Sequence, residues 1–172
     1  MSDSSKAVLD EAAVRALAER LGECLVSRAD MLACAESCSG GWLAKIITDL
    51  PGSSSWFAGS VVSYSNAFKR SLLGVPESTL TEFGAVSDKT VQAMCEGLLR
   101  SSEADVVVSI SGVAGPGGGT DDKPVGLVWL AWGVRDQGIE KASYNFSGNR
   151  EAVRLKAVAQ ALENVLNLLD CS

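Results

Sequence analysis

Apolar and polar residues alternate along the chain with two different periods. Between residues 8 and 25 apolar side chains recur every three or four positions, as in an amphipathic helix that packs on one face. Short runs rich in β-branched residues, such as DVVVSI at 105–110, instead indicate buried strands. The predicted helices span 8–25, 41–50, 66–73, 77–83, 87–101 and 151–169. The predicted strands span 31–35, 58–64, 105–110, 125–132 and 142–146, of which 58–64 is expected to be buried and 105–110 to be central.

Helix and strand patterns follow one another in alternation, which predicts a sheet covered by helices on both faces. The last two strands are linked by a short turn at 136–138 and should lie side by side, so the sheet is expected to be mixed but mostly parallel. We therefore predict an α/β fold, a three-layer α/β/α sandwich that forms one domain over residues 1–172.

Three unusual segments each lie at the end of a predicted strand. They are ESCSGG at 36–41, VSYSNAFK at 62–69 and the glycine-rich SISGVAGPGGG at 109–119. In open α/β sheets ligands bind beyond the carboxyl ends of the strands. The three segments are therefore expected to meet at one edge of the sheet and to form the functional site.

The composition narrows the classes of function. The chain has 15 basic and 21 acidic residues, a net charge of −6, and so lacks the positive surface that nucleic acid requires. No apolar run reaches the roughly 20 residues that cross a membrane, and the first residues are too polar and acidic for a secretory signal. We expect a cytoplasmic protein whose partner is a small molecule, with no nucleic acid and no membrane.

Histidine is absent from the sequence, which removes the commonest general base, the commonest metal ligand and the ordinary Ser-His-Asp hydrolase. The five cysteines are an odd count without CxxC spacing, so we expect them to be reduced thiols, mostly in the core. The chemistry is therefore expected to run on other side chains, without metal or cofactor.

Ser37 follows a predicted strand and precedes a helix that begins near Gly40 and Gly41. Unpaired backbone N–H groups at such a helix start favour an oxyanion or a phosphate, and glycines permit close approach. Taken alone, the segment favours the interpretation that Ser37 or Ser39 only caps the helix, which is the commoner role.

A serine nucleophile without histidine needs another base, and Lys69 is the leading choice. A lysine is protonated at neutral pH unless burial or a neighbouring cation, here Arg70, lowers its pKa. Tyr64 could relay the proton or bind substrate, and Asn66 is expected to cap the helix that carries Lys69. On ordinary frequencies a lone lysine is a solvated surface residue and a tyrosine here is packing.

The loop 112–119 and Arg150 are the candidate anion-binding groups. Consecutive backbone N–H groups of the loop can cradle a phosphate, although a loop that needs positive φ angles explains its glycines equally well. No P-loop or dinucleotide fingerprint is present, so neither ATP nor NAD is supported. Arg150 could bind a phosphate or carboxylate through two hydrogen bonds, or remain at the surface.

Cys38 offers an alternative nucleophile, because a thiol at a helix start is often acidified. With Glu36 and Lys69 it would form a Cys-Glu-Lys amidase. We rank it below Ser37 because Cys38 is expected to point into the core.

Four segments in the same order closely resemble the C-terminal domain of the CinA family, in particular its stand-alone nicotinamide mononucleotide deamidases. They are AESCSGGWLAKIITDLPGSSSWFAGSVVSYSN, LLGVPESTLTEFGAVSDKT, ADVVVSISGVAGPGGGTDDKPVGLVW and FSGNREAVR, and the similarity extends from about residue 7 to 168. The family usually has threonine where this chain has Ser39, a change that should keep a capping hydroxyl.

The resemblance implies hydrolysis of a nucleotide carboxamide to a carboxylate and ammonia. It assigns the nucleophile to Ser37, the tyrosine to Tyr64 and the lysine to Lys69, and it matches the family's arginine to Arg150. We expect backbone N–H groups near 38–41 to stabilise the oxyanion. The expected substrate-binding residues are Ser39, Gly40, Gly41, Asn66, Gly112, Gly115, Gly117 and Arg150.

Two rival functions remain open from the sequence. The chain could be a nucleotide-binding module without catalysis, or an amidase that depends on Cys38. The resemblance also implies a homodimer, weakly supported by Trp42 and Trp56, which flank segments expected at the surface.

Overall fold

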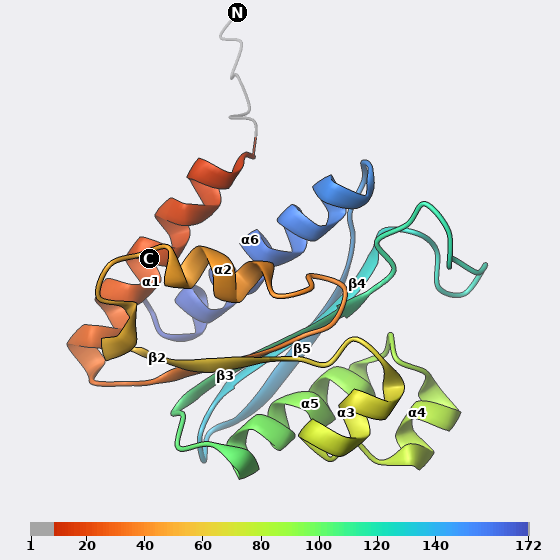
Figure 1. The fold of residues 1–172 in the computed structure, drawn as a ribbon, viewed down its shortest axis with the longest axis horizontal. Coiled ribbons are helices and arrows are strands. Elements are labelled where there is room, and N and C mark those ends of the chain that lie inside the picture. The colour runs from red at the N-terminus through yellow and green to blue at the C-terminus, as the bar shows by residue number, and fades with distance from the viewer. Residues whose placement is uncertain (1–8, 172) are drawn as a thin grey trace, which may run out of the picture.

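A computed structural model describes residues 9–171 as a five-stranded sheet between two layers of helices (Figure 1). Helices α1, α2 and α6 cover one face, and α3, α4 and α5 cover the other (Figure 1). The predicted three-layer architecture is confirmed. The helices are α1 Glu11–Arg28, α2 Trp42–Thr48, α3 Asn66–Leu73, α4 Glu77–Phe83, α5 Asp88–Ser101 and α6 Arg150–Leu168, and the strands are β1 Leu32–Glu36, β2 Phe57–Val62, β3 Val106–Gly112, β4 Leu127–Val134 and β5 Gly138–Asn145.

The strand order is β2-β1-β3-β4-β5, with β2, β1 and β3 parallel and with β4 and β5 antiparallel to their neighbours. The sheet is thus mixed, as predicted. Glu36 at the end of β1 pairs with Val62 of β2 on one side and with Ile110 of β3 on the other. The chain therefore leaves all three parallel strands at the same edge, which brings the three unusual segments together.

Four of the six helices in the described part of the chain begin at a polar side-chain cap, and α2 and α4 do not. Asp10 caps α1, Ser87 caps α5 and Asn149 caps α6, each accepting a hydrogen bond from the backbone N–H three residues ahead. The helix α1 was predicted from residue 8, which lies outside the described residues; within them it begins at Glu11. The apolar stripe of each helix then packs on its face of the sheet.

Three local predictions need correction. The strand predicted as buried at 58–64 is β2, an edge strand with partly exposed side chains, because only β1 pairs with it. The cap of α3 is Ser65, whose hydroxyl accepts from the Phe68 amide, and Asn66 is the first helical residue. The last strand begins at Gly138, four residues before the predicted 142, because it pairs along the whole of β4.

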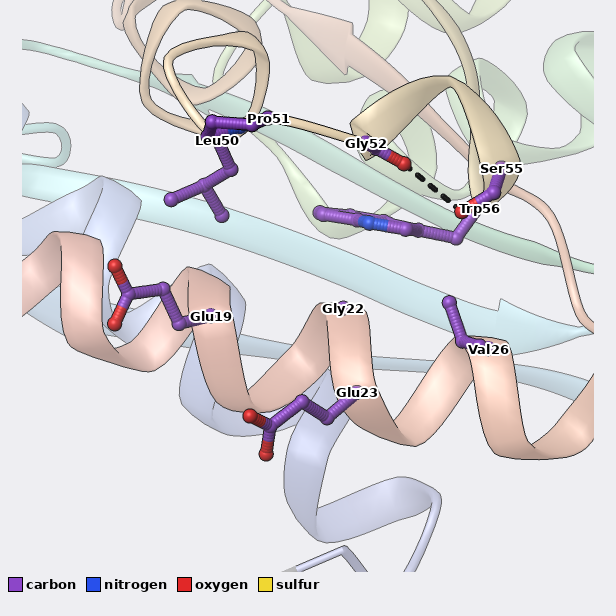
Figure 2. Close-up of a pocket in the computed structure, with 9 residues that line it drawn as sticks. All are labelled: Glu19, Gly22, Glu23, Val26, Leu50, Pro51, Gly52, Ser55 and Trp56. Carbon is purple, nitrogen blue, oxygen red and sulfur yellow. Dashed lines mark hydrogen bonds between the residues drawn. The ribbon is translucent and has the colours of Figure 1, made fainter.

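Trp56 follows the largely exposed segment 51–55, as expected, but its own side chain is buried, at 4% exposure. Its indole lies over Gly22 of α1, where a Cβ would come within 2.8 Å of the ring (Figure 2). Glycine at this position therefore permits the close approach. Beside this contact lies a hollow of about 480 Å³ between α1 and the segment 50–56, lined on the helix side by Glu19 and Glu23 (Figure 2).

The expectation of five reduced thiols is wrong for one pair. Cys24 of α1 and Cys171, just beyond α6, form a disulfide with Cα atoms 6.0 Å apart. The pairing follows from the packing of α1 against α6, which brings these two positions together. The other three cysteines, Cys34, Cys38 and Cys95, are free and buried, as expected.

Candidate active site

Glu36, the last residue of β1, is fully buried and holds the start of α2. One carboxylate oxygen accepts the N–H groups of Gly41 and Leu43 at 3.0 and 3.1 Å. The other accepts the N–H of Ala44 at 3.0 Å and the hydroxyl of Ser60 at 3.2 Å. A carboxylate that satisfies several helix-start amides stabilises them in the way a bound anion would.

This arrangement corrects two expectations for the segment 36–41. The amide of Gly41 is occupied by Glu36 and that of Gly40 by the Ser37 carbonyl, so neither is free to bind substrate. The Ser39 hydroxyl does not cap α2; it is buried and has no hydrogen-bond partner in the described part of the chain. The segment therefore fixes the position of Ser37 without leaving an open helix terminus.

Ser37 lies in the turn after β1, and its side chain faces Lys69 of α3. The Ser37 amide donates to the Ile110 carbonyl at 3.0 Å, which ties the turn to β3. The amine of Lys69 is 2.9 Å from the Ser37 hydroxyl oxygen and is also within hydrogen-bond distance of the Ser63 and Tyr64 carbonyls, at 2.7 and 3.3 Å. Lys69, in the first turn of α3, thus meets Ser37, the residue after β1, inside the protein.

Lys69 is completely buried, and no carboxylate pairs with its amine among the contacts described. Burial lowers the pKa of Lys69 from 10.5 to about 8, and the Cys38 thiol opposes the change slightly. The expected role of Arg70 in lowering this pKa is not found, because Arg70 points to solvent and pairs with Glu77 at 3.1 Å. At pH 7 about one Lys69 in ten is therefore neutral and able to accept a proton.

Tyr64 and Arg150 lie together at the mouth of the site. Arg150 donates to the Tyr64 hydroxyl at 2.9 Å and to the Gly115 carbonyl at 2.7 Å, which joins α6 to the glycine-rich loop. Gly115 has a φ of +82°, and a Cβ there would come within 2.4 Å of Val125. The Tyr64 side chain is 59% exposed, and its hydroxyl makes no described hydrogen bond to Ser37 or Lys69.

A pocket of about 200 Å³ lies in front of the Ser37 hydroxyl. Five of the predicted residues line it: Ser37, Tyr64, Lys69, Gly112 and Arg150. The predicted residues that do not line it are Ser39, Gly40, Gly41, Asn66, Gly115 and Gly117. The loop 112–119 thus contributes through Gly112, through Ala114 and through the Gly115 carbonyl that holds Arg150, and its remaining glycines are exposed to solvent.

Comparison with known proteins places the chain in a family. Residues 14–169 match the CinA C-terminal domain. This chain belongs to the CinA C-terminal domain family.

Relatives in the CinA family cover most of the chain. A protein of Escherichia coli K12 named nicotinamide-nucleotide amidohydrolase PncC is 49% identical over 87% of this chain and 90% of its own length. A protein of the same name from Pseudomonas putida is 48% identical over 90% of this chain and 96% of its own. The crystal structure of competence damage-inducible protein A from Klebsiella pneumoniae superposes with a TM-score of 0.88 at 37% identity, covering 91% and 97% of the two chains.

Several residues of this CinA-family site escaped the sequence prediction. Ser111, Ala85, Val86 and Ala114 also line the pocket, and the Ser111 hydroxyl donates to the Ala85 carbonyl at 2.7 Å. Small side chains in loops carry no distinctive sequence signal. Arg154 was missed as well, although it lies one helical turn after Arg150 and so shares its face of α6.

Cys38 lines the pocket but is an unfavourable nucleophile. Burial raises the pKa of the Cys38 thiol to about 11, so almost none of it is thiolate at neutral pH. Glu36, its proposed partner, is engaged with the amides of α2. The site therefore offers the hydroxyl of Ser37 and the amine of Lys69 as its reactive pair.

Residues 9–171 contain neither a metal-binding cluster nor a membrane-spanning helix. No group of three or more acidic or thiol side chains is arranged to hold a metal ion. No helix in this part of the chain has the length and apolar character needed to cross a membrane.

Proposed function

We propose that the protein hydrolyses the carboxamide of nicotinamide mononucleotide, giving nicotinate mononucleotide and ammonia. The observation that carries this proposal is the contact between the buried Lys69 amine and the Ser37 hydroxyl, 2.9 Å apart, in a pocket at the carboxyl edge of the sheet. The substrate is taken from the names of relatives that are 48–49% identical over nearly the whole chain.

The reaction begins when neutral Lys69 accepts the proton of the Ser37 hydroxyl. The serine oxygen attacks the amide carbon, a C–O bond forms, and the carbonyl oxygen takes the negative charge. Lys69 then returns the proton to the amide nitrogen, the C–N bond breaks, and ammonia leaves an acyl-enzyme on Ser37. Water, deprotonated by Lys69, then attacks the acyl carbon. Lys69 returns this proton to the Ser37 oxygen as the acyl C–O bond breaks, and the acid product loses its own proton to solvent as the carboxylate.

The negative oxygen of the intermediate needs hydrogen-bond donors that are already in place. The amides of Gly40 and Gly41 are occupied, whereas those of Cys38 and Ser39 donate to no other residue in the described part of the chain, and of these two only Cys38 lines the pocket. We assign the oxyanion to the Cys38 N–H group. This narrows the stretch 38–41 expected from the sequence to its first residue.

The size of the pocket limits which part of the substrate it takes. Pockets that enclose a whole small ligand are usually about 300–1,000 Å³, and this one is about 200 Å³. It suits the carboxamide and its ring, so the ribose and phosphate extend past the mouth. There Arg150 and the Tyr64 hydroxyl are the groups available, and we assign the phosphate to Arg150 and a substrate contact to Tyr64.

Two wider proposals accompany this function. The substrate is an intracellular metabolite, so we place the protein in the cytoplasm. We also propose a homodimer, supported by Phe68 and Leu72, which are about half exposed and lie one turn apart on α3.

The proposal is tested by ammonia release from nicotinamide mononucleotide with Ser37→Ala and Cys38→Ala. We expect Ser37→Ala to lose at least about 10³-fold in kcat, because the nucleophile is gone, while calorimetry still detects substrate binding. Cys38→Ala should retain turnover, and Ser71→Ala, at an exposed position on α3, controls for handling. Binding by the wild type without ammonia release would instead support a binding module, and full activity of Ser37→Ala would refute the mechanism.

A further inference from the structure

Arg154 holds the turn that follows Ser37 from the side of α6. Its Nε donates to the Cys38 carbonyl at 3.0 Å and its Nη2 donates to the Ser39 carbonyl at 2.9 Å. The guanidinium also lies over the Trp42 ring, 5.1 Å from its centre. A planar cation fixed by two hydrogen bonds and one ring has little freedom to move.

These bonds determine how the Cys38–Ser39 peptide is oriented. In a trans peptide the C=O and the following N–H point in opposite directions. A Cys38 carbonyl held by Arg154 therefore directs the Ser39 N–H away from the guanidinium. Of the two residues joined by this peptide, Cys38 lines the pocket and Ser39 does not, so the bonds to Arg154 fix the turn through which Ser37 and Cys38 reach the pocket.

The same turn is held from its other end by Glu36. The carboxylate binds the amides of Gly41, Leu43 and Ala44, whereas the guanidinium binds the carbonyls of Cys38 and Ser39. One charged group thus secures N–H donors of the turn and the other secures C=O acceptors. Each contact is charge-assisted, which makes it stronger than a neutral hydrogen bond.

We propose that Arg154 is a positioning residue for the reaction: it fixes the Cys38–Ser39 peptide, and with it the turn that holds the Ser37 hydroxyl and the Cys38 N–H at the pocket. This inference rests on the proposed function for the identity of the substrate. It assigns Arg154 no contact with the substrate. Removing it should therefore slow the chemical step and leave substrate binding intact.

The chain contains a matched control in Arg135. Its guanidinium also donates to backbone carbonyls, those of Leu99, Ser102 and Ala104, at 2.8–3.1 Å. Arg135 follows β4, whose antiparallel direction places it beside the start of β3, at the edge of the sheet opposite Ser37. Arg135→Ala removes a similar set of contacts without touching the turn after β1.

The test compares Arg154→Ala, Arg135→Ala and wild type in two assays, each normalised to the folded fraction. The first is kcat and KM for ammonia release from nicotinamide mononucleotide. The second is the rate at which a fluorophosphonate modifies Ser37, followed by mass spectrometry, which needs an oriented oxyanion donor but no nucleotide. Added guanidinium ion, at millimolar concentration, is included to refill the space left in Arg154→Ala.

We expect Arg154→Ala to lower both kcat and the phosphonylation rate by about 10- to 100-fold, as loss of one preorganised donor does. KM should stay close to the wild-type value, guanidinium should restore part of both rates, and Arg135→Ala should retain both. A rise in KM alone, or equal losses in the two variants, would overturn the proposal. If wild type is phosphonylated on Ser37 but releases no ammonia, the proposed substrate fails while the phosphonylation assay still tests Arg154.

Discussion

Burial of Lys69 favours catalysis but lowers the stability of the fold. Its amine is completely buried, and burial lowers its pKa to about 8. In the unfolded chain the pKa is near 10.5, so at neutral pH folding has to bury a charge that water would stabilise. A difference of this size corresponds to about 3 kcal/mol, partly offset by the hydrogen bonds of the amine.

Replacing Lys69 with methionine should therefore abolish turnover and stabilise the fold. We expect the free energy of unfolding at pH 7 to rise by about 1–3 kcal/mol. The sign depends on pH: between pH 8 and 10.5 the unfolded state binds more protons than the folded wild type, so wild-type stability rises and the advantage of Lys69→Met disappears. Urea unfolding at pH 7 and pH 10 measures this, with the exposed Lys89→Met as control. A less stable Lys69→Met at pH 7 would contradict the account.

At the scale of elements, the turn between β1 and α2 is the feature that places Ser37. Glu36 accepts four hydrogen bonds while fully buried, three of them from amides of α2. If Glu36 were replaced by glutamine, the side-chain N–H₂ group would face some of these N–H and O–H donors and could not accept their hydrogen bonds. The cost of leaving buried donors without an acceptor is about 1–3 kcal/mol.

Glu36→Gln is therefore expected to lower the free energy of unfolding by about 2 kcal/mol and to reduce kcat by about tenfold or more, because Ser37 loses its fixed position. Thermal unfolding and ammonia release measure the two effects. Glu23→Gln, on the exposed face of α1, should change neither. If the kcat of Glu36→Gln equals that of the wild type, the turn holds Ser37 in place without this carboxylate.

The elements were largely predictable because their signals are local. The bounds of α3 and α4 follow from helical spacing ended by glycine or proline, and the structure has them as predicted. The position of β2 at the sheet edge was not predictable, since it depends on which strands pair. The role of Glu36 was missed for a related reason: its four donors lie 5 to 24 residues away, and only the fold brings them to it.

The meeting of Ser37 and Lys69 has a similar origin. The sequence named both residues, but their 32-residue separation carries no geometric information. The topology rule for open sheets placed both segments at one edge, and burial of the amine emerged only in the structure. The source of the altered pKa was assigned to Arg70 from sequence adjacency, whereas desolvation is what acts on Lys69.

At the scale of the whole molecule, the Cys24–Cys171 disulfide joins the far end of α6 to α1. Arg150 begins α6 at the active site, and 19 residues of helix span about 28 Å, so the bond lies well away from Ser37. Reduction should therefore leave kcat unchanged and lower the free energy of unfolding by about 2–4 kcal/mol. Intact mass before and after reduction, with thermal unfolding and ammonia release, tests this; Cys24→Ser should match the reduced protein. Loss of activity on reduction would show that α1 and α6 control the site.

The most direct test of the central claim is the pH dependence of ammonia release. If neutral Lys69 is the base for Ser37, kcat/KM should rise with pH to an apparent pKa near 8, falling about tenfold per pH unit below it. The rise of kcat with pH should occur at lower pH than that of kcat/KM, because the positively charged pyridinium ring of the bound substrate disfavours a charged Lys69. A kcat/KM that stays constant between pH 6 and pH 9, with chemistry rate-limiting, would contradict the account.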